Sequence, residues 1–293
     1  MTTTLDIDRA EDRDFWRELQ PDLHIEGDPT PPRFEMDPEA LVRALKLEGY
    51  LNVPGIVPAH FTTRLHACIK RLHELNIPLI FAYAYDEMWQ VFQGVSPYLE
   101  AALGKGYRAL PDFWAWYVLN TDGEAGWGPH RDRVEPPSVG PDNEPYSLTV
   151  WLPFTEATPL NGCIYLVPAH LDPRYASRDF SGDLVIDDPQ SIRALPASPG
   201  SLLSWNQNVL HWGGRASHLG AAPRCSAAFE FQRADKPPFN EPLLEPRILP
   251  TMAQRLGLIG KQVLQYEHMY PLTKSMEAIA VQLRSSHLPS VGG

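Results

Sequence analysis

His130, Asp132 and His211 are the side chains whose types and spacing best suit a metal ion. His130 and Asp132 form a His-x-Asp triplet, and residues two apart on an extended strand point to the same side, so both can approach one ion. His211 would then arrive from a distant strand. Two imidazoles and one carboxylate are typical of mononuclear Fe(II) sites that keep open coordination positions.

A simpler interpretation competes with this one, because a His-x-Asp triplet arises by chance and a single histidine is more often structural or solvated. The order of the segments favours the metal site. The triplet lies between extended segments, and His211 follows the largely apolar run over residues 201–205. Five other histidines lack such partners, and we interpret them as structural or solvated: His24, His66, His73, His268 and His287.

Arg224 and Ser226 form a second alternating pair, in the strand-like run that follows His211. A planar guanidinium binds a carboxylate through two parallel hydrogen bonds, and a hydroxyl on the same face can add a third. We therefore expect this pair to hold the far carboxylate of a dicarboxylate co-substrate. Arg215 is the rival anchor, but it follows two glycines in a segment typical of a turn.

Residues Thr158 to His170 resemble a sequence motif of the phytanoyl-CoA dioxygenase family, which consists of Fe(II)- and 2-oxoglutarate-dependent oxygenases. In this chain the motif reads Thr-Pro-Leu-Asn-Gly-Cys-Ile-Tyr-Leu-Val-Pro-Ala-His. Pro199-Gly200-Ser201 resembles the family's approach to its distal histidine, and the match covers about residues 112–233. The resemblance implies that the His-x-Asp pair and the distal histidine bind Fe(II). It also implies that the arginine and serine of the next strand bind 2-oxoglutarate.

Two further co-substrate contacts are implied by the same resemblance: Asn120, on the strand before the triplet, and Trp127, three residues before the first histidine. Alternatively, the aromatic segment 113–119 is a strand that packs rings on both sides. We also expect substrate contacts from Trp116, Arg131, Arg215 and Trp212, although the arginines also suit solvated loops.

The composition limits the partners of this 293-residue chain. A net charge of −11 argues against a nucleic-acid surface, which would need clustered Lys and Arg. The same charge gives no electrostatic attraction to an anionic membrane. Three cysteines without Cys-x-x-Cys spacing indicate neither a disulfide framework nor a zinc site. No apolar signal segment or membrane span is evident, so we expect a soluble, cytoplasmic protein.

Helices are predicted at both ends of the chain. We expect an irregular lead-in over residues 1–35, with a short helix near Phe15, and then a single oxygenase domain over residues 36–293. Asp37 and Pro38 are a favourable start for a helix that ends at Gly49. The other predicted helices span residues 58–75, 86–103, 252–266 and 275–283, the last two in a C-terminal tail over 250–285.

From Tyr107 the pattern changes to short strands separated by Gly, Pro and Asn turns, which is typical of a sandwich or barrel. We predict a mainly β fold with flanking α: a double-stranded β-helix (jelly-roll, cupin-like) core over about residues 107–235, with N- and C-terminal helices. Residues 171–199 form a long insertion that suits an active-site lid or a surface ornament. The clearer strands span residues 146–152, 163–167, 201–205 and 224–232, and residues 50–53 resemble the first strand of the same oxygenase family.

Together these features predict a dioxygenase that uses Fe(II), 2-oxoglutarate and O2 to hydroxylate a C–H bond of a small, non-CoA metabolite, of the kind found in specialised metabolism. An acyl-CoA carries several phosphate charges, which an acidic chain does not favour. Desaturation, cyclisation or demethylation by the same oxidant stays open, as does a cupin-like isomerase or lyase. Arg224 and Ser226 argue against the latter. The substrate and the oligomeric state stay open, a homodimer being one option.

Overall fold

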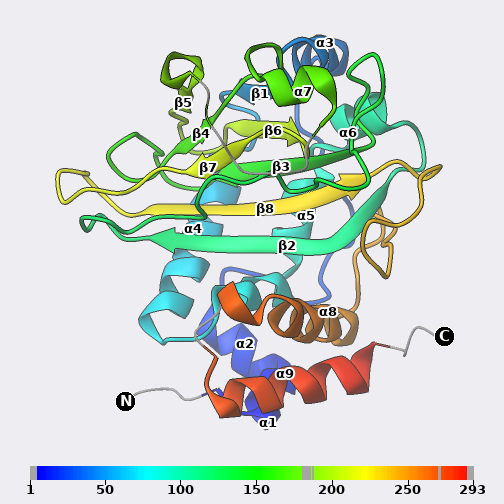
Figure 1. Cartoon of the computed structure of the whole chain (residues 1–293). Helices are drawn as coiled ribbons and strands as arrows, with labels where there is room; N and C mark the ends of the chain where they lie inside the picture. The colour runs from blue at the N-terminus through cyan, green and yellow to red at the C-terminus, as the bar shows by residue number, and fades with distance from the viewer. Residues whose placement is uncertain (1–4, 180–185, 187, 270–271, 289–293) are drawn as a thin grey trace.

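Two antiparallel sheets form the centre of the computed structural model, which describes residues 5–179, 186, 188–269 and 272–288 (Figure 1). The larger sheet has the strand order β1-β6-β3-β8-β2, and the smaller has the order β5-β4-β7. The predicted class, mainly β with flanking helices, is confirmed in that form. The strands are β1 Tyr50–Val53, β2 Arg108–Val118, β3 Ser147–Pro153, β4 Ile164–Leu166, β5 Arg193–Leu195, β6 Leu202–Asn206, β7 His211–Gly213 and β8 Arg224–Gln232.

Most helices lie on the face of the larger sheet that is turned away from the smaller one, with α8, α9, α1 and α2 at the base of the molecule (Figure 1). The helices α3 and α7 lie at the other end of the molecule, at the top of the view, where α3 packs on α6 and on strand β1. None of the helices in the described residues is both long and apolar enough to cross a membrane. The helices are α1 Ile7–Glu11, α2 Arg13–Leu19, α3 Pro38–Glu48, α4 Ala59–Glu74, α5 Asp86–Gln93, α6 Ser96–Leu103, α7 Pro173–Ser177, α8 Met252–Gln265 and α9 Lys274–His287.

Strand β8 is buried along its whole length because both of its faces are covered. Cys225, Phe229 and the other odd-numbered residues belong to the apolar cluster beneath the helices, whereas Ala228 belongs to the cluster between the two sheets. Successive side chains of a strand point to opposite faces. Arg224, Ser226 and Glu230 therefore point into the space between the sheets, together with Ala228.

The predicted boundaries near α3 are confirmed. Asp37 caps the helix by accepting a hydrogen bond from the backbone N–H of Ala40, and Pro38 occupies its first turn. Gly49 ends the helix in a left-handed conformation with φ of 81°, which glycine adopts without the Cβ clash that other residues meet. Strand β1 begins at the next residue, and α4 follows where a helix was expected.

The expectations about two helical regions were only partly right. The short helix expected near Phe15 is present as α2, but α1 was not expected, and Trp16 of α2 lies in the helix-side core, where it is fully buried and stacks on Phe81 at 5.5 Å. The stretch 86–103 is not one helix but two, α5 and α6, which are separated at Gly94 and Val95. In both places tertiary packing overrides the local pattern.

The insertion over residues 171–199 contains α7, a short 3-10 helix at Pro189–Ser191 and strand β5. Tyr175 of α7 is buried and its hydroxyl lies 2.5 Å from Asn206 Nδ2, so this part packs against the core. Residues 180–185 and 187 lie outside the described residues. The expectation of an active-site lid falls partly on them, and it stays a prediction.

Candidate metal centre

The three predicted metal ligands come together between the two sheets. His130 and Asp132 lie in the loop between β2 and β3 rather than on a strand, and His211 begins β7. A pair of backbone hydrogen bonds of 3.0 Å joins His130 to His211 in both directions. This isolated bridge keeps the triplet locally extended, so the alternation expected for a strand still holds. The three ligand atoms lie within 4.8 Å of one another.

Both imidazoles are oriented by backbone carbonyls. Nδ1 of His130 lies 2.7 Å from the Gly128 carbonyl oxygen, and Nδ1 of His211 lies 3.0 Å from that of Val209. A carbonyl oxygen only accepts, so each Nδ1 carries the proton and each Nε2 keeps a free lone pair. The two Nε2 atoms lie 3.3 and 3.4 Å from the same atom, Asp132 Oδ1.

The carboxylate of Asp132 is held from its other oxygen. Oδ2 accepts hydrogen bonds from Thr149 Oγ1 at 2.7 Å and from Trp205 Nε1 at 2.9 Å. Although burial opposes ionisation, the neighbouring imidazoles of His211 and His130 and the hydrogen bond from Thr149 lower the pKa of Asp132. Burial lowers the pKa of His211 to about 4. At neutral pH the site therefore offers an ionised carboxylate and a neutral imidazole, which are the forms that bind metal.

The arrangement fits a metal ion. Metal to ligand distances of about 2.1 Å place neighbouring ligand atoms about 3 Å apart, close to the separations around Asp132 Oδ1. His130 Nε2 is buried and has no hydrogen-bond partner in the described part of the chain. Two imidazoles, one carboxylate and space on one side form the donor set of a non-haem iron site.

Trp205 connects Asp132 to the larger sheet and gives a prediction for the second coordination shell. We expect Trp205→Phe to keep the ring contact with His211, whose centroid lies 4.5 Å away, but to remove the hydrogen bond to Asp132. Loss of such a contact weakens metal binding by about 10-fold or more. Titration of Fe(II) under argon against a competing chelator measures the change. Trp212→Phe is the matched control, because Trp212 stacks on Tyr165 outside the site. Equal iron affinity in the two variants would contradict the assigned role.

Arg224 is a buried cation at the start of β8. It is 2% exposed, its Nη1 lies 2.6 Å from Ser226 Oγ, and its guanidinium lies 5.5 Å from the ring centre of Trp151. Among the described residues no carboxylate lies within ion-pair distance of it, and Nε is buried without a partner. Burial lowers the pKa of Arg224 to about 10, so it stays charged at neutral pH. A buried charge is costly unless it is paired, which indicates a site for an anion.

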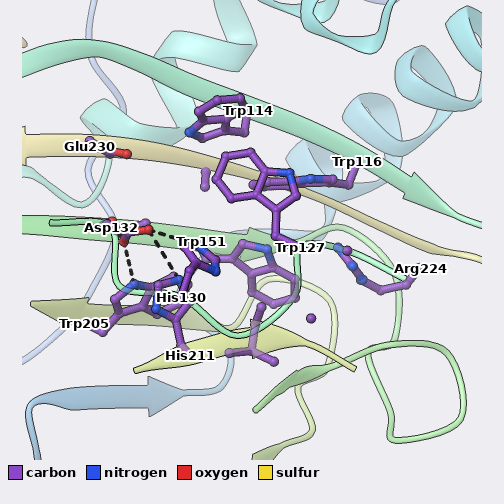
Figure 2. A pocket seen from close by; sticks show the side chains of 15 residues that line it. Trp114, Trp116, Trp127, His130, Asp132, Trp151, Trp205, His211, Arg224 and Glu230 are labelled. Atoms are coloured by element: carbon purple, nitrogen blue, oxygen red, sulfur yellow. Dashed lines mark hydrogen bonds and ion pairs between the residues drawn. The ribbon is translucent and has the colours of Figure 1, made fainter. Parts of the chain in front are cut away.

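One pocket contains both the metal-ligand set and Arg224 (Figure 2). Figure 2 shows Arg224 at one end and Asp132 with Glu230 at the other, with Trp116 and Trp127 between them. Five of the eight tryptophans of the chain line this pocket. Its lining consists of Trp114, Trp116, Gly126, Trp127, His130, Asp132, Thr149, Trp151, Ile164, Trp205, His211, Gly213, Arg224, Ala228 and Glu230.

The pocket has room beside Arg224 because two glycines meet there. A Cβ on Gly126 would lie 3.3 Å from Arg224 Nη2, and a Cβ on Gly213 would lie 3.0 Å from the Gly126 Cα. Any larger side chain at either position would have to displace backbone or the guanidinium. The close approach of these two segments therefore keeps the guanidinium accessible from the pocket.

Several predicted contacts do not reach the pocket. Asn120 donates a hydrogen bond to the Gly220 carbonyl oxygen instead, at 3.0 Å. Arg131 forms a buried ion pair with Asp172 at 2.8 Å, so its role is structural. Arg215 is exposed in a loop, and Trp212 points away from the metal ligands because it alternates with His211 on β7. Trp116 and Trp127, by contrast, line the pocket as expected.

Glu230, Thr149 and Trp205 are among the pocket residues that sequence reasoning missed, and each has a polar group that interacts in the site. For Glu230 a signal was present, since it follows Arg224 and Ser226 at the even spacing of one strand face. Thr149 and Trp205 contact Asp132 from two different strands, β3 and β6, and no sequence spacing connects them. Only the pairing of these strands brings the two donors together.

The antiparallel sheets, the His-Asp-His set and the unpaired buried arginine define the class of Fe(II)- and 2-oxoglutarate-dependent oxygenases. Residues 106–218 match the model of the family described as phytanoyl-CoA dioxygenase (PhyH). The match covers part of the chain and confirms the resemblance seen in the sequence. No curated protein sequence matches the chain.

Solved structures with the same fold include two with a TM-score of 0.52. One is SnoK, a non-haem α-ketoglutarate-dependent carbocyclase from nogalamycin biosynthesis, 16% identical over 73% of this chain and 99% of its own. The other is ThoJ, a non-haem monooxygenase, 12% identical over 84% of this chain and 99% of its own. HygX from Streptomyces hygroscopicus, solved with iron bound, has 13% identity and a TM-score of 0.49 over 71% of this chain and 91% of its own.

Proposed function

We propose that this protein is an Fe(II)- and 2-oxoglutarate-dependent dioxygenase that hydroxylates a C–H bond of a small, non-CoA metabolite. The observation that carries the proposal is a single pocket with a His-Asp-His set near one end and an unpaired buried arginine at the other. A cupin-like isomerase or lyase would use the three ligands but has no dicarboxylate for Arg224 to bind. The arginine therefore favours the oxygenase.

We also propose that the two sheets form a double-stranded β-helix within one domain over residues 36–293. The apolar cluster between them supports this, since it joins residues from both sheets, such as Trp114 of β2 and Ile164 of β4. The N-terminal helices α1 and α2 pack instead on the other apolar cluster, on the helix-covered face of the larger sheet.

In the proposed mechanism His130, Asp132 and His211 hold Fe(II), which together with 2-oxoglutarate and O2 supplies the oxidant for the C–H bond. Arg224 and Ser226 bind the far carboxylate of 2-oxoglutarate, because the guanidinium has free donors and no other anion. The protein orients these groups and excludes water with indole walls, and it needs no acid or base of its own.

The pocket supports a free metabolite rather than an acyl-CoA. Among the residues that line it, Arg224 is the sole permanent cation, and the co-substrate occupies it in this proposal. No second basic group of the lining is left for the phosphates of a CoA ester. The net charge of −11 points the same way.

The test is coupled turnover. Protein supplied with Fe(II), ascorbate and 2-oxoglutarate should form succinate, and a metabolite extract should yield a product heavier by one oxygen atom in the same amount. A product that has lost two hydrogens would assign desaturation or cyclisation instead, and one that has lost a methyl group would assign demethylation. Absence of 2-oxoglutarate binding and of any succinate would overturn the oxygenase assignment.

A further inference from the structure

Glu230 is a buried carboxylate of the pocket that the metal site and the co-substrate anchor do not use. It lies six residues after Arg224 on the same face of β8, so the Cα atoms of the two residues are separated by about 20 Å along the strand. Figure 2 shows Glu230 beside Asp132, at the end of the pocket away from Arg224. Glu230 is therefore placed to meet a second ligand rather than 2-oxoglutarate.

One carboxylate oxygen of Glu230 is held by the protein and the other is not. Oε2 accepts hydrogen bonds from Gln207 Nε2 at 2.6 Å and from Arg133 Nη2 at 3.3 Å. Within the described residues no donor lies within hydrogen-bond distance of Oε1, and 9% of the surface of the side chain is exposed. Because Glu230 lines the pocket, a donor on a bound molecule is the group that can reach Oε1.

The charges around Glu230 do not balance. Arg133 Nη2 also lies 3.9 Å from the fully buried Asp112, so one guanidinium serves two carboxylates. The other partners of Asp112 are neutral: the amide of Asn240 and the hydroxyl of Tyr266. Burial, together with Asp112 and Asp132, raises the pKa of Glu230 well above its ordinary value, as expected for a carboxylate short of positive charge.

Lys261 is a further cation that interacts with Asp112: burial lowers the pKa of Lys261, and the charge of Asp112 opposes that shift. Lys261 Nζ lies within hydrogen-bond distance of Asn240 Oδ1 and Gln265 Oε1, and it makes no ion pair with Asp112 or Glu230 among the described residues. Glu230, which lines the pocket, therefore has Arg133 as its one ion-pair partner among the described residues, and it shares Arg133 with Asp112. A cationic ligand is therefore favoured there over a neutral or anionic one.

Three tryptophans supply the walls between Glu230 and the co-substrate anchor (Figure 2). The ring centres of Trp114 and Trp127 are 4.4 Å apart with the planes at 80°, and those of Trp116 and Trp127 are 5.9 Å apart at 82°. Such edge-to-face walls present indole surfaces in different orientations. Indole is the best cation–π partner among side chains and also packs well on apolar rings.

We propose that the substrate carries a protonated amine, which Glu230 binds through Oε1, and an apolar or ring-shaped body, which Trp114, Trp116 and Trp127 hold. This inference rests on the proposed function, because it names the substrate class of the same pocket. In the competing interpretation Glu230 only orients Arg133. That role predicts no preference for the charge of a ligand.

The experiment compares three ligands that share a phenyl ring and differ in charge: 2-phenylethylamine, 2-phenylethanol and 3-phenylpropionate. Each is titrated by calorimetry under argon into the protein loaded with Fe(II) and 2-oxoglutarate. We expect the amine to bind at least about 10-fold more tightly than the alcohol, and the acid to bind most weakly. Glu230→Gln should bring the amine to the affinity of the alcohol and leave the alcohol unchanged. Glu124→Gln, at an exposed position, is the matched control and should keep the wild-type order.

The outcomes separate this inference from the proposed function. Binding of 2-oxoglutarate to the iron-loaded protein, measured in the same variants, tests the function and should not change in Glu230→Gln. If 2-oxoglutarate does not bind at all, the function fails, and the three ligands can still be compared on the iron-loaded protein. Equal affinity of amine and alcohol in the wild type, or no binding of the amine, overturns the inference even if Glu230→Gln does not fold.

Discussion

His211→Ala is expected to remove iron binding and turnover together, with a loss of more than about 1000-fold in kcat/KM, equivalent to about 4 kcal/mol. His211 supplies one of three ligand atoms, and its Nε2 lies 3.4 Å from Asp132 Oδ1 across the site. Without it the remaining imidazole and carboxylate cannot hold the ion against water. Asp132→Ala should have the same effect. Iron per chain, measured by plasma mass spectrometry after gel filtration, and succinate formation are the two readouts.

The matched controls are histidines outside the site. His170 lies 3.4 Å from Glu48 at a half-exposed position, and His218 lies 2.7 Å from the exposed Asp122. His170→Ala and His218→Ala should therefore keep one iron per chain and wild-type turnover. Unchanged iron affinity in His211→Ala would remove the basis of the metal assignment. An equal loss in a control variant would show that the effect is general destabilisation.

Arg224→Ala should leave iron in place and weaken 2-oxoglutarate binding by about 2 to 4 kcal/mol, which is roughly 30-fold to 1000-fold. The guanidinium is buried and has no carboxylate partner among the described residues, so its contact with a dicarboxylate is charge-assisted and shielded from water. Arg224→Lys should recover only part of the loss, because an ammonium keeps the charge but not the bidentate geometry. Titration of 2-oxoglutarate into iron-loaded protein under argon measures both effects.

Arg215→Ala is the control for this prediction, since Arg215 is exposed and lies outside the pocket. It should bind 2-oxoglutarate as the wild type does. The opposite result, in which Arg215→Ala loses 2-oxoglutarate and Arg224→Ala keeps it, would exchange the two roles. Loss of iron in Arg224→Ala would indicate that the substitution disturbs the whole pocket.

Local rules explain what was predictable in the fold. A capping aspartate, a proline in the first turn and a left-handed glycine mark α3 because each acts within a few residues. The division at Gly94 and the burial of Trp16 were not predictable, since both depend on partners far away in the chain. Packing against Phe81 determines where Trp16 lies, and Phe81 is outside the first 35 residues, so the sequence of that segment does not predict the contact.

The candidate site divides in the same way. His130, Asp132, His211, Arg224 and Ser226 follow from the sequence alone, because alternation on extended chain and the donor chemistry of each side chain select them. The family motif also predicts their order along the chain, with the His-x-Asp pair first, the distal histidine next and the arginine with the serine last.

Only the tertiary structure decided what surrounds these groups. Asn120 donates its hydrogen bond to the Gly220 carbonyl oxygen, outside the pocket, whereas Glu230 lies in the pocket beside Asp132. Arg133 lies between two carboxylates from different strands, those of Asp112 and Glu230. Charge balance and hydrogen-bond satisfaction in a buried site depend on every group within a few ångströms. Strand pairing brings those groups together from distant parts of the chain, so sequence spacing selects the candidate ligands while tertiary packing decides which other groups line the pocket.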